Sequence, residues 1–191
     1  MNIVVASNNK NKLREIREIL GDKFENIYSL SDLNIECDAE ETAETFEGNA
    51  LIKAKAVAEL AKMPALSDDS GVCVEYLGGA PGVHSARYSG VHGNDEANID
   101  TLLKNLENAD NRRASFVSSV VLYYPSGETV TGRGETFGEI LFERDGNCGF
   151  GYDPIFYSYE LQKSFGKATE AEKNSVSHRA KALKDLLSKL K

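Results

Sequence analysis

The sequence predicts an α/β protein, and three observations favour this fold class. Short runs of β-branched and other apolar residues, typical of buried strands, recur along the chain. Longer segments in which apolar residues return every three or four positions, typical of amphipathic helices, separate these runs. The chain has 191 residues, 41% of them hydrophobic and 27% charged, which is long enough to bury a core. We therefore expect one domain over residues 1–191.

Charge and cysteine content narrow the function classes. The formal net charge of -8 argues against an extended nucleic-acid groove or an anionic membrane surface as partner. The three cysteines have no paired spacing, so they suggest neither a disulfide framework nor a zinc site. No apolar run has the length of a membrane span, and Met1 leads directly into a strand rather than a signal peptide. We expect a cytoplasmic protein with no nucleic-acid or membrane partner.

The first predicted strand, residues 3–6, leads into the polar segment SNNKNK, residues 7–12, and then into a helix that ends at Gly21. A polar loop between a strand and a helix presents backbone N–H groups and the positive end of the helix dipole. Together with two lysines, this pattern is typical of a phosphate site, although the glycines of a Walker loop are absent. A plain turn capped by Ser7 or Asn9, with solvated lysines, explains the same residues.

An acidic loop, residues 34–44, precedes a long amphipathic helix predicted from about Thr45 to Lys62. Such a loop is usually only solvated, but Glu41 lies close enough to the helix to reach a metal at its end. Asn49 and Lys53 share one strip of the helix because they are one turn apart.

The stretch from Ala65 to Tyr88 holds two adjacent carboxyl groups, Asp68 and Asp69. We expect it to begin as a strand, turn at Gly71, and continue as an alternating strand through residues 72–76. Two neighbouring carboxylates repel each other, so the pair requires a cation, most simply a divalent ion that prefers oxygen ligands. Asp-Asp-Ser-Gly is also turn chemistry, and a hairpin turn without any ligand explains the same residues.

The rest of the chain continues the alternation of strands and helices. We expect a helix from about Asn94 to Leu106 and a hairpin turned at residues 125–127, whose sheet continues through residues 140–142. Thr169 and Glu172 have the spacing of a capping box. A final helix follows residues 173–179.

The segment GNCGFGYDPIF, residues 146–156, combines glycines with aromatic residues. Aromatic rings beside glycines can form a flat surface that stacks on a base. Alternatively, Phe150 and Tyr152 pack inward within a strained turn. Lys173, His178 and Arg179 then place positive charge before the final helix, the reverse of what the helix dipole favours, which suggests an anion nearby.

In this order and spacing, five segments resemble the inosine/xanthosine triphosphate pyrophosphatase family over essentially the whole chain: ASNNKNK, ETAETFEGNALIKA, LSDDSGVCVEYLGGAPGVHSARYSG, GFGYDPIF and KNSVSHRAKAL. The resemblance implies an elongated mixed β-sheet flanked by helices, two lobes with a central substrate cleft, and usually a homodimer. It implies an Mg²⁺-dependent nucleotide diphosphatase that cleaves ITP, dITP and XTP between the α- and β-phosphates. The products are the monophosphate and pyrophosphate.

The resemblance also assigns roles to residues. Glu41 and Asp69 bind the metal, and Asp69 or Asp68 orients the attacking water. Lys53 and Ser70 also contact the substrate. The phosphates are held by Ser7, Asn8, Asn9, Lys10, Asn11 and Lys12. The purine is surrounded by Phe150, Gly151, Tyr152, Asp153, Lys173, His178 and Arg179.

Departures from the family pattern are modest. Ser7-Asn8-Asn9 replaces a frequent Thr-Gly-Asn, Ala43 a common glycine and His84 a common tyrosine, and none removes a charge that the mechanism needs. Three rival interpretations remain: a nucleotide-binding protein without catalysis, a Maf-like pyrophosphatase for modified pyrimidine nucleotides, and an RNA-binding module. The retained Glu41 and Asp69 oppose the first, the Ser-His-Arg segment 177–179 the second, and the acidic net charge the third.

Overall fold

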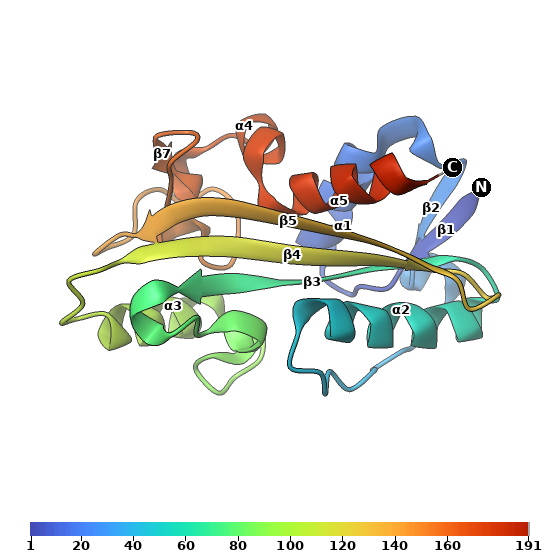
Figure 1. Cartoon of the computed structure of the whole chain (residues 1–191), viewed down its shortest axis with the longest axis horizontal. Coiled ribbons are helices and arrows are strands. Elements are labelled where there is room, and N and C mark those ends of the chain that lie inside the picture. The colour runs from blue at the N-terminus through green and yellow to red at the C-terminus, as the bar shows by residue number, and fades with distance from the viewer. Residues whose placement is uncertain (191) are drawn as a thin grey trace. The chain divides into compact units, whose positions relative to one another are not determined.

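The computed structural model describes residues 1–190 and contains a mixed seven-stranded sheet with flanking helices (Figure 1). The strands follow the order β2-β1-β3-β4-β5-β6-β7 across the sheet. The strands are β1 (Asn2–Val5), β2 (Asn26–Ser29), β3 (Ala65–Val74), β4 (Arg113–Tyr123), β5 (Thr129–Ile140), β6 (Phe156–Ser158) and β7 (Lys163–Ser164). The helices are α1 (Lys10–Leu20), α2 (Phe46–Ala61), α3 (Asp95–Asn105), α4 (Glu170–Val176) and α5 (His178–Lys189). The predicted α/β class with a mixed sheet is confirmed.

The chain forms two compact units. Among the described residues, unit 1 comprises Met1–Asp69, Ser118–Gly134 and residues 179–190, and unit 2 comprises Ser70–Val117 and Glu135–His178. Within the described residues, no helix combines the length and the apolar character needed to cross a membrane.

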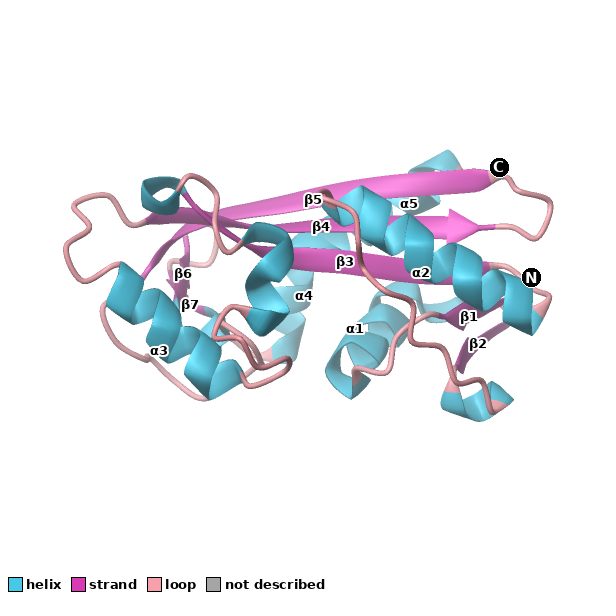
Figure 2. Cartoon of the chain, turned by 90° about the horizontal axis from the view of Figure 1, so that it is seen from below, coloured by secondary structure: helices cyan, strands magenta, loops and turns pink. Residues whose placement is uncertain are grey.

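In unit 1, helices cover both faces of the strands. β1 pairs in parallel with β2 and with β3, and parallel strands of this kind are apolar on both sides. Ile3 and Val5 pack against α1 and α5, whereas Val4, which points the other way, packs against α2. Figures 1 and 2 show α2 and α5 on opposite sides of these strands. This sandwich explains why the first strand is an unbroken apolar run.

The carboxyl end of β1 determines where the acids of β3 lie. β1 ends at Val5, opposite Leu66, while β3 continues for eight more residues. Asp68 and Asp69 therefore lie just beyond the end of β1, where the chain turns into α1. Because successive side chains of a strand alternate, Asp68 faces the α1/α5 side, like Leu66, and Asp69 faces the α2 side.

The turn predicted at Gly71 is wrong, since β3 runs without interruption from Ala65 to Val74. Asp-Asp-Ser-Gly is a sequence typical of turns, but here it is part of β3, which is hydrogen-bonded between β1 and β4 in the sheet. Each acid also has cationic partners on its own side of the sheet, described below, so neither needs the solvent exposure that a turn provides.

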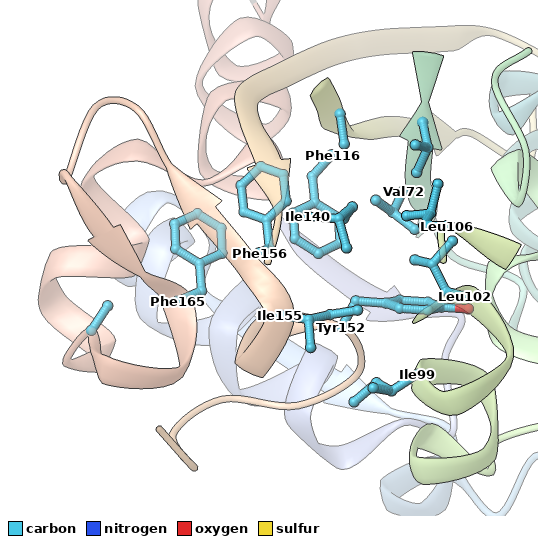
Figure 3. Packing of buried hydrophobic residues seen from close by; sticks show 13 residues of the cluster. Val72, Ile99, Leu102, Leu106, Phe116, Ile140, Tyr152, Ile155, Phe156 and Phe165 are labelled. Atoms are coloured by element: carbon cyan, nitrogen blue, oxygen red, sulfur yellow. The ribbon is translucent and has the colours of Figure 1, made fainter. Parts of the chain in front are cut away.

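Unit 2 has a core rich in aromatic residues, which Figure 3 shows from close by. The ring centroids of Phe116 and Phe156 are 4.5 Å apart, and those of Phe156 and Phe165 are 5.2 Å apart. Tyr152 is buried in the same cluster, and its hydroxyl donates to the carbonyl oxygen of Ser85 at 2.6 Å. Burial raises the pKa of the Tyr152 hydroxyl. The inward-packing interpretation is therefore correct for Tyr152.

Local signals in the sequence predict most element ends correctly. Gly21, with φ of 49°, ends α1, and the Thr45 side chain accepts the Gly48 N–H at the start of α2. The Thr169–Glu172 capping box is present. The hairpin between β4 and β5 turns where predicted, although β5 ends at Ile140 rather than continuing further.

The close approach of β5 to α5 predicts that Gly132→Ala destabilises the fold. A Cβ at Gly132 would lie against the carbonyl oxygen of Ala182 and 2.6 Å from the backbone nitrogen of Leu186. We expect the free energy of unfolding, measured by urea denaturation, to fall by about 1–3 kcal/mol, the usual effect of overpacking. Thr129→Ala, at an exposed position on the same strand, is the control and should change it by less than about 0.5 kcal/mol. Equal midpoints for both variants would contradict this packing.

Candidate active site

The segment between β1 and α1 is a capped turn. The Asn9 side-chain oxygen accepts the backbone N–H groups of Asn11 at 3.0 Å and Lys12 at 3.1 Å, and the Ser7 hydroxyl accepts the Asn9 N–H at 3.1 Å. The capping interpretation is thus correct for Asn9, which is the N-cap of α1, whereas Ser7 only orients the Asn9 backbone. Asn8 and Lys10 are exposed. The cap fixes the start of α1 at the end of β1, where backbone N–H groups and the helix dipole favour an anion.

Lys12 differs from a solvated lysine. Its side chain is largely buried, and its ammonium lies 3.2 Å from a carboxylate oxygen of Asp68. Burial lowers the pKa of Lys12, although Asp68 opposes this effect. The turn therefore directs one of its two lysines into the protein, toward the acids of β3.

Arg179 is 1% exposed and belongs to the same group of charges in unit 1. Its guanidinium donates to Asp68 through both Nε and Nη2 at 3.1 Å, and Nη1 donates to Glu15 of α1. Burial alone would raise the pKa of Asp68, but Lys12 and Arg179 outweigh it and hold this pKa well below its usual range. The basic C-terminal segment suggested a nearby anion. For Arg179, that anion is provided by two carboxylates of the protein, Asp68 and Glu15.

Asp69 has a separate set of partners on the α2 side. The Lys53 ammonium lies 2.6 Å from a Glu41 oxygen and 3.5 Å from an Asp69 oxygen, so both carboxylates meet at one cation. Burial raises the pKa of Asp69 despite the opposing charges of Lys53 and Lys12. For Lys53, the nearby carboxylates outweigh burial and raise its pKa. The adjacent acids of β3 therefore differ: Asp68 is held ionised, whereas Asp69 binds a proton more readily.

Asn49 connects the two carboxylates that meet at Lys53. Its side chain is fully buried, accepts the Ala43 N–H at 2.9 Å and donates to Asp69 at 3.4 Å. The first hydrogen bond holds the loop that carries Glu41, and the second holds Asp69. A satisfied buried amide of this kind fixes the geometry of both groups.

The sequence motifs did not identify Glu15 or Asn49 as site residues. The signal for Asn49 was its position one turn before Lys53 on the same strip of α2. The signal for Glu15 was weaker, because the sequence shows only an acid next to the apolar positions of α1. In the structure Glu15 is buried, as are Ile16 and Leu20. A buried acid requires a cation, but its partner lies 164 residues away in the sequence.

The donor set of Glu41 and Asp69 fits a hard divalent ion. Mg²⁺ is commonly bound through one or two carboxylates, with phosphate oxygens and water completing its shell. Within residues 1–190 there is no cluster of three or more His, Cys, Asp and Glu side chains suited to a metal. The two carboxylates therefore fit an ion that is shared with a phosphate ligand better than an all-protein metal cage.

Unit 2 holds the second group of predicted site residues. The Lys173 ammonium lies 2.7 Å from an Asp153 oxygen, and both side chains are buried. The same ammonium lies 4.4 Å from the centre of the Phe150 ring, a cation–π contact, and Asp153 also accepts the Phe150 N–H at 2.9 Å. His178 is stacked on Phe116, with ring centroids 4.8 Å apart. These contacts join an aromatic ring and an ammonium donor in one cluster.

The chemistry of the two clusters defines a class of protein. In unit 1, lysines, paired carboxylates and a helix N-terminus suit a polyphosphate with a divalent ion. In unit 2, an aromatic ring and an ammonium donor suit a planar base with an oxygen acceptor. The class is that of α/β proteins that act on nucleotides.

A model of the Ham1 family matches residues 3–189, so the chain belongs to the Ham1 family. It is 44% identical to a dITP/XTP pyrophosphatase of Clostridium perfringens, over 98% of this chain and 96% of that protein. It is 45% identical to a dITP/XTP pyrophosphatase of Haemophilus influenzae, over 98% of each. Its structure is similar to the Staphylococcus aureus Ham1 protein, with a TM-score of 0.88, 40% identity, and 98% and 97% of the two chains covered. The HAM1 protein from Coxiella burnetii has the same TM-score and coverage, at 39% identity.

The buried charges predict that Arg179→Met destabilises the fold, because Glu15 and Asp68 would lose their shared partner. Removing one member of a buried ion pair typically costs about 3–5 kcal/mol, and we expect a loss of this size in urea denaturation. Arg17→Met is the matched control, since Arg17 pairs with Asp32 at the surface and should contribute less than about 1 kcal/mol. Similar losses for the two variants would refute the assignment of Arg179 to the buried network.

Proposed function

We propose that this chain is a dITP/XTP pyrophosphatase. It hydrolyses ITP, dITP and XTP to the monophosphate and pyrophosphate and so removes these nucleotides from the pool. The observation that carries the proposal is the meeting of Glu41 and Asp69 at Lys53, next to Asp68, which precedes Asp69 on β3 and pairs with Lys12 of α1. The names and the 44–45% identity of the two bacterial relatives support the choice of substrate.

Binding of the substrate requires positive charge, because a nucleoside triphosphate carries about four negative charges. We assign the phosphates to the turn of residues 7–12 and to Lys53. The positive end of the α1 dipole and the Lys12 ammonium attract phosphate oxygens. Ser70, which directly follows the acids of β3, is assigned a further substrate contact.

We assign Mg²⁺ to Glu41 and Asp69, where it would supply positive charge against the phosphate oxygens. Asp69 orients the attacking water and accepts its proton, a role that suits a carboxylate whose pKa is raised by burial. Asp68, which Lys12 and Arg179 hold ionised, keeps these two cations in place. Because Asp68 pairs with both Lys12 and Arg179, we favour Asp69 over Asp68 as the base.

Selection of the base is assigned to Phe150, Asp153, Lys173 and His178, while Tyr152, which packs into the core, fixes the loop that carries Phe150 and Asp153. Hypoxanthine and xanthine carry an oxygen acceptor at position 6, where adenine carries an amino donor. An ammonium has three N–H donors, so Lys173 can bind an oxygen while it also binds Asp153. An amino group would face a donor, and sites built on such hydrogen bonds reject mispaired analogues strongly.

The backbone of the loop is a less suitable source of donors than its sequence suggests. The N–H groups of Phe150 and Gly151 already donate to Asp153 and Asp95, at 2.9 Å and 2.8 Å. The side chains of Lys173 and His178 are therefore the donors that we favour. Arg179 is retained as a residue that affects substrate binding through Asp68 and Glu15.

Three further parts of the proposal are supported by the resemblance of the sequence motifs to the inosine/xanthosine triphosphate pyrophosphatase family. Residues 1–191 act as one domain, the chain works as a homodimer, and the enzyme is cytoplasmic.

Pyrophosphate release from a panel of nucleotides tests the proposal. ITP, dITP, XTP, ATP, GTP and dUTP are compared with and without Mg²⁺. We expect release from the first three, only with the metal, and far less from ATP. Preference for dUTP would favour a pyrimidine-specific enzyme, and binding without turnover would favour a nucleotide-binding protein.

Asp69→Asn should reduce turnover of ITP at least about 100-fold, because it removes both a ligand charge and a proton acceptor with little change of volume. Circular dichroism and thermal unfolding should remain close to those of the unmodified protein. Asp38→Asn, at an exposed position in the acidic loop, is the control and should retain full activity. Near-normal turnover of Asp69→Asn would remove this residue from the mechanism.

A further inference from the structure

The aromatic loop, residues 146–156, has a hydrogen bond at its tip that its sequence does not reveal. The backbone N–H of Gly151 donates to a carboxylate oxygen of Asp95 at 2.8 Å. Asp95 is the first residue of α3 and lies 56 residues earlier in the chain. No motif of the sequence singled out Asp95.

Gly151 can be held only through its backbone. Its φ of 59° is in the left-handed region, which favours glycine, and a Cβ built there would find no atom within 4 Å. On the side where a Cβ would lie, packing therefore does not hold this residue. The carboxylate of Asp95 is a strong acceptor, and a hydrogen bond with one charged partner is stronger than a neutral one.

The two neighbours of Gly151 are anchored differently. Tyr152 is fixed by the core and by its hydrogen bond to Ser85. Phe150 has its backbone N–H bonded to Asp153, but its side chain is only partly buried, and its ring contacts the Lys173 ammonium. A displacement of Gly151 would therefore move Phe150 more readily than Tyr152.

The helix that carries Asp95 is a firm support. Asn98, one turn further along α3, is buried, accepts the Ser89 N–H at 2.8 Å and donates to the Ala86 carbonyl at 3.1 Å. Ile99 and Leu102 insert into the core of unit 2, as Figure 3 shows. Asp95 thus links the tip of the loop to a helix whose position is determined by the core.

We propose that Asp95 is a positioning residue for base recognition, which fixes Gly151 and thereby the Phe150 ring and its contact with Lys173. The inference depends on the proposed function and deepens it, since it concerns the selection of keto-purines. Loss of the carboxylate weakens binding of the base, while the phosphate and metal residues of unit 1 are unchanged. KM for ITP therefore rises more than kcat falls, and preference for ITP over ATP declines.

Three variants test the proposal by steady-state kinetics with ITP and ATP. Asp95→Ala should raise KM for ITP on the order of 5-fold, the effect of one hydrogen bond, with kcat within about 2-fold. Asp95→Asn keeps an oxygen acceptor at the same place and should restore most of the loss. Glu96→Ala is the matched control, because the neighbouring Glu96 carboxylate binds Arg144 at 2.7 Å. It should behave like the unmodified protein.

A second measurement does not depend on activity. Hydrogen exchange of the Gly151 amide, followed by NMR in the full chain, should accelerate in Asp95→Ala but not in Asp95→Asn or Glu96→Ala. Unchanged exchange would disprove the link between Asp95 and the loop. Faster exchange with unchanged KM and unchanged preference for ITP would overturn the role in recognition. If the unmodified chain hydrolyses none of the keto-purine nucleotides, the proposed function fails, and with it that role, while the exchange data still decide whether the link exists.

Discussion

Two adjacent carboxylates buried on β3 are the constraint on which unit 1 depends. Asp68 and Asp69 lie beyond the end of β1, at 2% and 6% exposure, where unpaired charges would be very unfavourable. Because they point to opposite faces of the sheet, each needs a cation from a different layer. Lys12 and Arg179 serve Asp68, and Lys53 serves Asp69. These ion pairs therefore link β3 to α1, α2 and the start of α5, in addition to the apolar packing of the helices.

The same arrangement gives the two acids different chemical properties. Asp68 accepts several charge-assisted hydrogen bonds and remains ionised, so it acts as a fixed anchor for cations. Asp69 has fewer compensating partners, and burial raises its pKa. Its neighbours Glu41 and Asn49 hold it in a group that can share a divalent ion with a phosphate. Two identical side chains at consecutive positions can therefore have an anchoring and a reactive role.

Unit 2 follows a different principle, because aromatic packing, together with the buried Lys173–Asp153 ion pair, supports its predicted site residues. Tyr152 and Phe116 belong to the core, while Phe150 lies at its edge against the Lys173–Asp153 pair. A loop rich in glycine can bring its backbone close to a ligand, but it must be held by other parts of the unit. Lys173 and, by our inference, Asp95 provide that support from α4 and α3.

The sequence by itself determined the features that depend on nearby residues: the helix ends at Gly21, Thr45 and Thr169, the hairpin at residues 125–127, and the family. Capping and turn chemistry act over a few residues, so they can be recognised without a fold. Only the tertiary structure showed that β3 continues without a turn at Asp68 and Asp69, and that Arg179 binds Asp68, 111 residues away. It also revealed Glu15, Asn49 and Asp95, because the partner that explains each side chain is brought close only by folding.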